Sequence, residues 1–246
     1  IDAHCHLDFP DFDADREAVF ERARAVGVSH FVVPGTTRAR WADVLALGKR
    51  DDVSVCLGLH PYFMAQHGAG DVAALAEALD GSGQRGEPKV VAVGECGIDA
   101  RFPETLDAQW RLFDAQLRLA KASCLPAVIH CVRANDRVAK RLRELAPPAG
   151  GLIHAFAGSL EQARRFIDLG FAVGLGGAVT HERAGRLRRA VASLPDDGFV
   201  LETDSPDMPL AGRQGERNEP TRVVEVCRVV AELRGQSEEA VAAAST

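Results

Sequence analysis

The chain has 246 residues, of which 46% are hydrophobic and 26% are charged, and this composition excludes a disordered or collagen-like protein. Its 29 basic and 35 acidic residues give a formal net charge of -6, which excludes a broad cationic surface that would hold nucleic acid without specificity. A chain of this length buries enough apolar surface for one sizeable core, so we expect a single domain over residues 1–246.

Short apolar runs, each followed by a longer amphipathic stretch, recur along the chain at a loose period of about 25 to 35 residues. The apolar runs predict eight strands, at residues 1–6, 30–33, 53–59, 90–95, 127–130, 152–155, 171–175 and 199–203. The amphipathic stretches predict helices that include residues 16–25, 106–122, 134–145, 160–169, 183–192 and 219–233. This alternation predicts a (β/α)8 TIM-type barrel, whose active site lies at the carboxyl ends of the strands.

An open, doubly wound sheet is the alternative fold, because it also alternates strands and helices. Such a sheet normally carries a glycine-rich phosphate loop after an early strand, and the sequence has none there. The segment GLGG at residues 174–177 follows the seventh predicted strand and lacks the GxGxxG spacing. We therefore interpret it as a tight turn between a strand and a helix, and the barrel is favoured.

Histidines and carboxylates stand at the ends of the predicted strands. His4 and His6 point to the same face of the first strand because side chains alternate along a strand. Taken alone, this pair fits a metal site or two core histidines equally well. Four further ionisable residues stand at or just after the ends of later strands, namely Glu95, His130, His154 and Asp204. In a barrel, all six meet at one rim.

Six ionisable groups buried together require partners, and metal ions supply them. Six ligands exceed what one tetrahedral ion with an open position needs, so two divalent ions are the simpler account. Such a pair activates a water molecule and holds both oxygens of a displacement reaction, and Glu95 is the predicted bridging ligand. The donor set leaves the metal open among Zn, Mn, Mg, Fe and Ni.

The chain resembles the TatD-family deoxyribonucleases, a branch of the metal-dependent hydrolase barrels. The resemblance covers essentially the whole chain and is carried by IDAHCHLD from residue 1, GLHP at 58–61, GECGID at 94–99, LPAVIH ending at residue 130, GGLIHAFAGS through residue 154, GLGGAVT from residue 174 and LETDSP at 201–206. It implies a TIM-type barrel, a pair of divalent metals and hydrolysis of phosphodiester bonds in DNA. It also implies metal-ligand roles for the same six residues: His4, His6, Glu95, His130, His154 and Asp204.

The lysines help to place the chain within that superfamily. The phosphotriesterase and dihydroorotase branches resemble each other in bridging their metals with a carboxylated lysine. Lys89 begins a predicted strand instead of ending one, and the other lysines, which are Lys49, Lys121 and Lys140, fall in helical patterns. Glu95 takes the bridging place, which favours the nuclease branch.

Three departures from the family pattern concern the substrate. The arginine that follows the fifth strand stands one residue later than in many members, at Arg133. Ala100 replaces an aromatic residue that usually follows the fourth strand, and HCFSG becomes HAFAG at residues 154–158. We expect a substrate preference that can differ from that of relatives.

Further roles follow from position. Asp204 can both hold an ion and accept the proton of the attacking water, so we predict both roles for it. Glu202 lies two residues earlier on the same face and is interpreted either as support beneath the metals or as a core carboxylate paired with an arginine. His60 follows the third strand, where it can reach a substrate phosphate or orient a ligand.

Other features bear on location and assembly. No run approaches the ~18 apolar residues of a membrane span, and no basic segment followed by an apolar run opens the chain, so we expect a cytoplasmic protein. The six cysteines are scattered without a CxxC pair and are predicted to be mostly buried, reduced thiols. We expect a monomer.

Three functions remain open on these residues. The first is a DNA phosphodiesterase that attacks strand ends or short fragments, with DNA captured locally because the net charge is acidic. The second is an amidohydrolase-type enzyme for a small-molecule amide or ester, which uses the same cluster. The third is a metal-binding partner protein without catalysis, and the complete ligand set argues against it.

Overall fold

The computed structural model describes residues 1–84, 86 and 88–246. They form two compact units. The terminal unit comprises Ile1–Val32, Ala155–Asp168 and Ala172–Thr246, and the central unit comprises Val33–His154 and Leu169–Phe171.

The strands are β1 (Phe31–Pro34), β2 (Val53–Leu57), β3 (Val90–Asp99), β4 (Ala127–Val132), β5 (Gly151–Ile153), β6 (Phe171–Leu175) and β7 (Phe199–Leu201). The α-helices are α1 (Arg16–Ala25), α2 (Trp41–Leu47), α3 (Asp71–Gly81), α4 (Leu106–Ala122), α5 (Asn135–Leu145), α6 (Leu160–Ile167), α7 (Gly185–Val191), α8 (Val223–Arg234) and α9 (Glu238–Ala244). Short 3-10 helices are η1 (Pro10–Phe12), η2 (Arg38–Arg40), η3 (Pro61–Gln66), η4 (Pro103–Thr105), η5 (Gly177–Thr180) and η6 (Pro220–Arg222).

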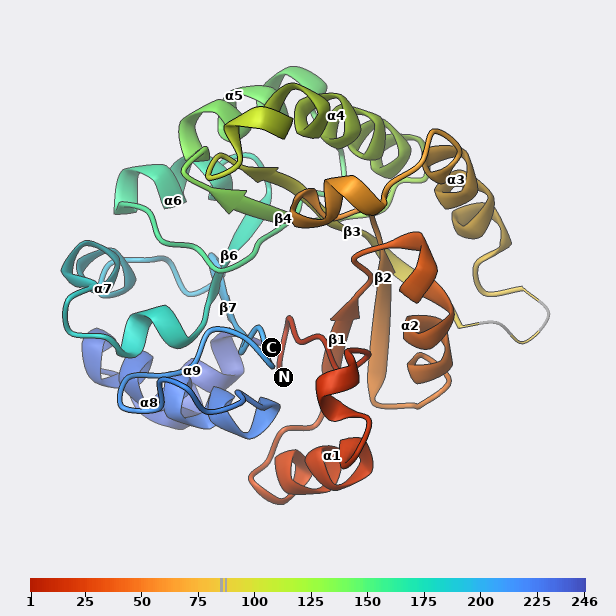
Figure 1. Cartoon of the computed structure of the whole chain (residues 1–246). Helices are drawn as coiled ribbons and strands as arrows, with labels where there is room; N and C mark the ends of the chain where they lie inside the picture. Colours follow the sequence, from red (N-terminus) through yellow and green to blue (C-terminus); the bar gives the residue numbers. More distant parts are fainter. Residues whose placement is uncertain (85, 87) are drawn as a thin grey trace. The chain divides into compact units, whose positions relative to one another are not determined.

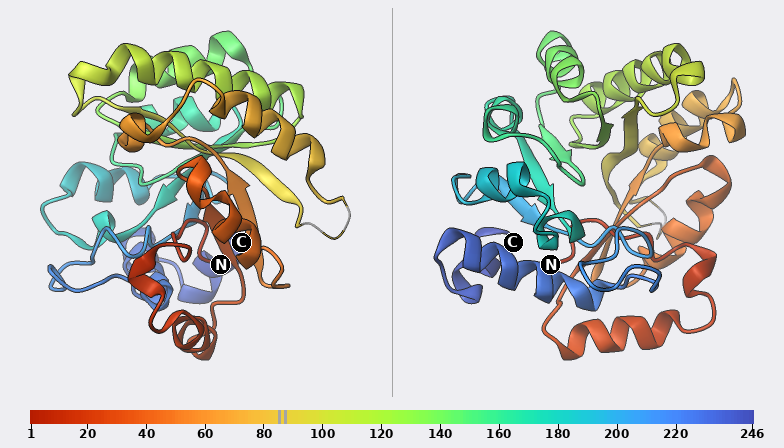
Figure 2. Two further views of the ribbon diagram at one scale, coloured as in Figure 1. Left: turned by 45° about the vertical axis from the view of Figure 1, so that its right-hand side comes forward. Right: turned by 60° about the vertical axis from the view of Figure 1, so that its left-hand side comes forward.

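The central unit is built on the parallel strands β2, β3, β4 and β5, each paired with the next (Figure 1). Their residues are mainly apolar and mostly buried, as expected for a parallel sheet covered on its faces. Helices α2, α4 and α5 pack on β2, β3 and β4, and the further views in Figure 2 show them on the same side of these strands. Because the strands are parallel, their carboxyl ends share one edge.

In the terminal unit, residues 2–6 take the place of a strand. Asp2 forms a parallel bridge with Phe31, and the backbone of Asp2 and Cys5 forms hydrogen bonds with the chain around the start of β1. On the other side, the backbone of this segment is hydrogen-bonded to residues 201–205. Strands β6 and β7 of the same unit pair in parallel.

The alternation of strands and helices confirms the predicted pattern, with two corrections. Residues 1–6 form only the bridge at Asp2, because their hydrogen bonds are too irregular for a strand, so the described residues contain seven strands instead of eight. Strand β3 continues to Asp99, beyond the predicted end at Glu95. Helices α1 and α4 have the predicted bounds, whereas α9 was not predicted. The predicted turn at residues 174–177 is confirmed, since β6 leads there into η5. The single-domain assignment stays a prediction.

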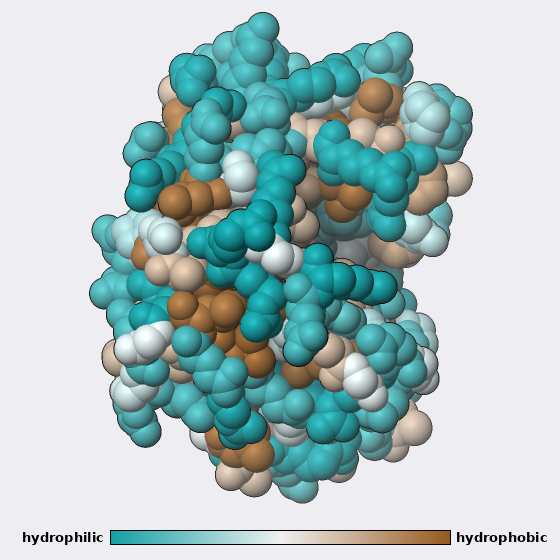
Figure 3. All heavy atoms as spheres, turned by 90° about the vertical axis from the view of Figure 1, so that its left-hand side faces the viewer, coloured by the Kyte–Doolittle hydropathy of each residue, from teal (hydrophilic) through white to brown (hydrophobic). Residues whose placement is uncertain are grey.

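Most buried side chains are apolar, and they include the phenylalanines Phe12, Phe20, Phe113 and Phe199. Several buried residues are ionisable instead, and those at or near strand ends include His4, His6, His60, Glu95, Asp99, His154 and Glu202. Hydrophilic side chains cover most of the face drawn in Figure 3, with small hydrophobic areas between them. Within the described part of the chain, no helix has both the length and the apolarity needed to cross a membrane.

Candidate metal centre

Three predicted ligands meet in the terminal unit. The Nε2 atoms of His4 and His6 are 3.3 Å apart, and Asp204 Oδ1 lies 3.6 Å from the first and 3.5 Å from the second. His4 is fully buried and His6 nearly so. The imidazole of His6 also stacks on the ring of Phe9, with the ring centroids 4.7 Å apart. The predicted convergence of these three side chains is confirmed.

The spacing of these donor atoms fits a metal ion. Ligands bonded at about 2.0–2.1 Å to a tetrahedral ion stand about 3.3–3.4 Å from one another, close to the separations among His4, His6 and Asp204. Two imidazoles and one carboxylate are also a donor set typical of Zn and similar divalent ions. The carboxylate charge beside both ring nitrogens favours a cation at their centre.

The loop that carries Asp204 is fixed by buried hydrogen bonds. Thr203 donates from its backbone N–H and its hydroxyl to the Asp2 carboxylate, at 2.9 and 2.6 Å. Burial raises the pKa of Asp2 to about 7, although the bonds from Thr203 act in the opposite direction. The Asn218 amide donates to the carbonyls of Thr203 and Asp207, at 2.9 and 2.8 Å. Asp204 itself has a left-handed φ of 57°, a conformation that this loop holds in place.

Glu202 is fully buried in the terminal unit. Its Oε1 accepts the backbone N–H of Ala155, the residue that follows His154, at 2.5 Å. A Cβ atom at Gly174 would overlap the Glu202 carboxylate, so a larger residue there would require the Glu202 side chain to move. The residue thus touches the chain next to a predicted ligand, as support beneath a metal site requires.

A second group of predicted site residues surrounds Glu95 in the central unit. Glu95 Oε1 lies 2.9 Å from His60 Nε2, 3.0 Å from His130 Nδ1 and 3.7 Å from His154 Nε2. Glu95 and His154 are 1% and 3% exposed, so these groups interact in a largely dry environment. The structure therefore brings these three predicted ligands and His60 together.

The tautomer of His60 follows from its two hydrogen bonds. Its Nδ1 accepts the backbone N–H of Tyr62 at 3.0 Å, so the proton of the neutral ring is on Nε2. Nε2 then donates to Glu95 Oε1, which fixes the direction of that carboxylate. Of the two roles considered for His60, this geometry favours orienting a ligand.

We expect His60→Ala to weaken divalent-metal binding about 10- to 100-fold, because Glu95 loses the donor that orients it. Chelator competition with Zn or Mn measures the change. His60→Gln, whose amide can donate in the same way, should restore part of the affinity, and His181→Ala serves as the control. Wild-type affinity in His60→Ala would show that Glu95 is held by other groups.

Asp99 is a site residue that the sequence reasoning missed. It is fully buried and accepts a hydrogen bond from His130 Nε2 at 3.3 Å, so both ring nitrogens of His130 face carboxylates. Burial alone lowers the pKa of His130, but its bonds with Asp99 and Glu95 outweigh burial and raise it. Burial likewise raises the pKa of Asp99, yet its hydrogen bonds from Arg101 and His130 hold that pKa below its usual range. Period-two alternation from Glu95 is the signal that could have found Asp99.

Arg133 takes no part in this cluster. It is exposed, has a left-handed φ of 54°, and follows directly after the end of β4. Within the described residues it makes no hydrogen bond or ion pair. Its contact with a substrate phosphate stays a prediction.

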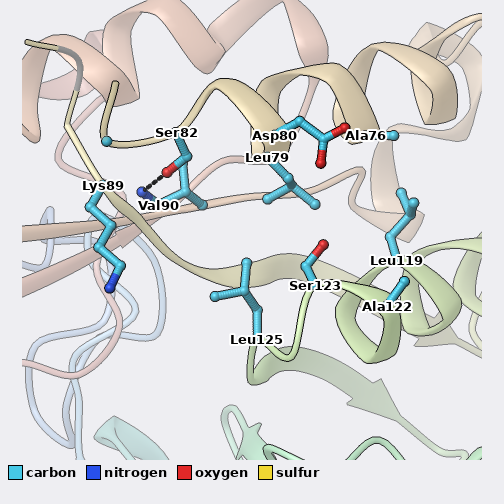
Figure 4. Close-up of a pocket in the computed structure, with 11 residues that line it drawn as sticks. Ala76, Leu79, Asp80, Ser82, Lys89, Val90, Leu119, Ala122, Ser123 and Leu125 are labelled. Carbon is cyan, nitrogen blue, oxygen red and sulfur yellow. Dashed lines mark hydrogen bonds between the residues drawn. The ribbon is translucent and has the colours of Figure 1, made fainter. Parts of the chain in front are cut away.

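A separate cavity of about 750 Å³ lies between α3, α4 and the first residue of β3 (Figure 4). Leu79, Leu119 and Leu125 supply apolar walls, and the Ser82 hydroxyl there accepts the backbone N–H of Val90. It lies at the amino end of β3, whereas Glu95 and Asp99 lie toward the carboxyl end. None of the predicted ligands lines it, so we do not assign it to the metal centre.

The chain is similar to known proteins over nearly its whole length. The family described as TatD related DNase matches residues 1–246. An uncharacterized metal-dependent hydrolase, YjjV of Escherichia coli K12, is 42% identical, and the match covers 99% of this chain and 93% of that protein. A 3'-5' ssDNA/RNA exonuclease TatD of Pantoea ananatis is 36% identical, with 98% and 94% covered.

The crystal structure of Escherichia coli YjjV, described as a TatD homolog, superposes with a TM-score of 0.93 at 41% identity, covering 99% of this chain and 93% of that one. Such agreement over nearly the whole chain confirms the predicted fold class. The chain therefore belongs to the TatD related DNase family and is a metal-dependent hydrolase with a TIM-type barrel fold.

Proposed function

We propose that this protein is a divalent-metal-dependent deoxyribonuclease that hydrolyses phosphodiester bonds at the ends of DNA strands. The observation that carries the proposal is the metal-like spacing of the donor atoms of His4, His6 and Asp204. The second group around Glu95 supports it, as does the relation to a protein described as a 3'-5' ssDNA/RNA exonuclease.

In this proposal, two divalent ions are held by the six predicted ligands. His4, His6 and Asp204 would hold one ion, and Glu95, His130 and His154 would hold the other. Bound ions would supply positive charge that polarises the phosphodiester and makes water more acidic. The bridging role of Glu95 and the identity of the metal, Zn, Mn, Mg, Fe or Ni, stay predictions.

The protein residues then have distinct tasks. Asp204, whose side chain is 16% exposed, stands at the boundary between the buried histidines and solvent and accepts the proton of the attacking water. His60 orients the Glu95 carboxylate through its Nε2–H. Glu202 fixes the backbone next to His154 through the Ala155 N–H.

Glu202→Gln tests the supporting role of that residue. The amide retains an oxygen that can accept the Ala155 N–H but loses the negative charge, so we expect turnover of DNA to fall about 10-fold at unchanged metal content. Steady-state kinetics measure the turnover of DNA, and elemental analysis of the same preparation measures the metal content. Full turnover would show that Glu202 serves only the packing of the terminal unit.

A direct test uses end-labelled single- and double-stranded DNA. The protein is stripped with a chelator and assayed without metal and after addition of Mg, Mn or Zn. We expect the DNA strand to be shortened from one of its ends only after metal is restored. Asp204→Asn should not shorten it. The pattern of products also gives the direction of attack.

Other outcomes favour other functions. Absence of DNA cleavage with every ion, in protein that binds about two metal equivalents, would favour an amidohydrolase-type enzyme for small amides or esters. Bound metal without hydrolysis of esters, amides or phosphodiesters would favour a metal-binding partner protein. Cleavage of DNA by chelator-treated protein would contradict the metal-dependent mechanism.

A further inference from the structure

An exposed aromatic side chain, Tyr62, lies beside the Glu95 group of the central unit and contacts the half-buried Phe102. Tyr62 is 58% exposed, whereas most large hydrophobic side chains of the described residues are covered. Its ring meets that of Phe102 edge to face, with the centroids 5.5 Å apart and the planes at 80°. It meets the ring of Phe63 in the same way at 5.2 Å. Tyr62 is exposed, and Phe63 and Phe102 are half-buried, so this cluster offers partly accessible flat surfaces for another ring.

A cation adjoins the aromatic pair. The Arg101 guanidinium carbon lies 5.7 Å from the centre of the Phe102 ring, and half of the side chain is exposed. Its Nε and Nη2 atoms bind the Asp99 carboxylate at 2.9 and 2.5 Å, which holds the guanidinium in one orientation. Among the described residues, its Nη1 donates to no protein acceptor, so two N–H groups can reach a ligand.

Short connections link these surface residues to the candidate ligands. The backbone N–H of Tyr62 binds His60, whose other nitrogen binds Glu95. Asp99, which holds Arg101, also accepts the hydrogen bond from His130. The aromatic and cationic groups are therefore fixed relative to Glu95 and His130, as groups that position a substrate must be.

From this arrangement we infer that Tyr62, Phe102 and Arg101 form a nucleotide-binding surface for a single strand. A base stacks on the rings of Tyr62 or Phe102, and the neighbouring phosphate binds Arg101 Nη1. The inference rests on the proposed nuclease function, and it assigns the residues that would hold a base and a phosphate of the strand. Tyr62 and Phe102 could thus take the place of the aromatic side chain that many family members have at the position of Ala100.

Binding of a short fluorescein-labelled oligothymidylate tests the stacking. Metal-loaded Asp204→Asn protein serves as the cleavage-deficient parent, and the competitor is the same strand with abasic residues. We expect Tyr62→Ala or Phe102→Ala to raise Kd about 5- to 100-fold and to abolish the preference for the strand with bases. Phe102→Leu retains the apolar bulk and controls for loss of packing, and Val26→Ala truncates another exposed apolar side chain.

Salt dependence tests the phosphate contact separately. Arg101→Ala should reduce the slope of log Kd against log salt concentration by about 0.7, the value for one contact to a single strand, whereas Arg111→Ala on α4 should leave it unchanged. The aromatic variants should keep the parental slope.

The possible results separate the two proposals. If the parent binds the strand and active protein cleaves DNA, but the aromatic variants bind with parental Kd and retain the base preference, the binding surface is overturned and the nuclease proposal stands. If active protein cleaves no DNA and the parent binds no oligonucleotide, both proposals fail. The expected rise in Kd and fall in salt slope, together with DNA cleavage by active protein, would support both.

Discussion

Asp204→Asn should reduce DNA hydrolysis by about a thousandfold or more while the protein stays folded. The amide has nearly the same shape, so the loop held by Thr203 and Asn218 keeps its hydrogen bonds. It lacks the charge that sits 3.5 and 3.6 Å from the two imidazole nitrogens, and it cannot accept the proton of the attacking water. The loss of the charge and the loss of the proton acceptor both slow the attack of water on the phosphodiester. Initial rates with end-labelled DNA measure the loss of activity, and circular dichroism shows whether the protein stays folded.

Asp197→Asn provides the matched control, since it makes the same substitution at an exposed position of the same unit. We expect it to retain the wild-type rate. Elemental analysis of Asp204→Asn should show weakened retention of one metal equivalent. A variant that cleaves DNA at the wild-type rate would remove Asp204 from the mechanism.

Gly97→Ala should lower the free energy of unfolding by about 3 kcal/mol or more. Gly97 has a φ of 143°, which side chains rarely adopt, and a Cβ atom there would overlap the backbone of His130 on the neighbouring strand. Strain at such a φ costs about 1–3 kcal/mol, and forcing an extra atom into a packed interior adds a similar amount. Denaturant unfolding followed by circular dichroism measures the change.

Gly81→Ala is the control for this substitution. Gly81 is the last residue of α3, its φ is ordinary, and a Cβ atom there would meet nothing within 4 Å. Alanine has the better helix propensity, so we expect unchanged or slightly increased stability. Equal stability of the two variants would show that β3 and β4 can separate without cost.

Much of the fold could be predicted from the sequence because each strand is a short apolar run and each helix has a regular apolar face. Helices α1 and α4 illustrate this, since their bounds agree with the pattern. The six residues could be singled out as candidate ligands because ionisable residues buried at the ends of apolar runs are costly unless they have partners. His4, His6 and Asp204 do converge, although nearly two hundred residues separate them.

Other features depend on information that pattern reading does not contain. The polar Glu95 closes the apolar run that begins at Val90, so the predicted strand ended there, whereas β3 continues to Asp99. The regular alternation at His4 and His6 predicted a strand, but the hydrogen bonds of this segment are irregular. Tyr62 and Phe102 stand 40 positions apart, and only the folded chain shows that their rings meet. The role of Asn218 in holding the loop of Asp204 is likewise visible only in the folded chain, where its amide donates to the carbonyls of Thr203 and Asp207.

The pairing of Asp2 with Thr203 joins residues that are 201 positions apart. At a synthesis rate of about 5–20 residues per second, the ribosome takes about 10–40 seconds to pass from one partner to the other. During that interval, the two histidines next to Asp2 have no Asp204 with which to share an ion. For the proposed metal centre, complete assembly of this ligand group would therefore follow synthesis of residue 204 and formation of the hydrogen bonds between Thr203 and Asp2.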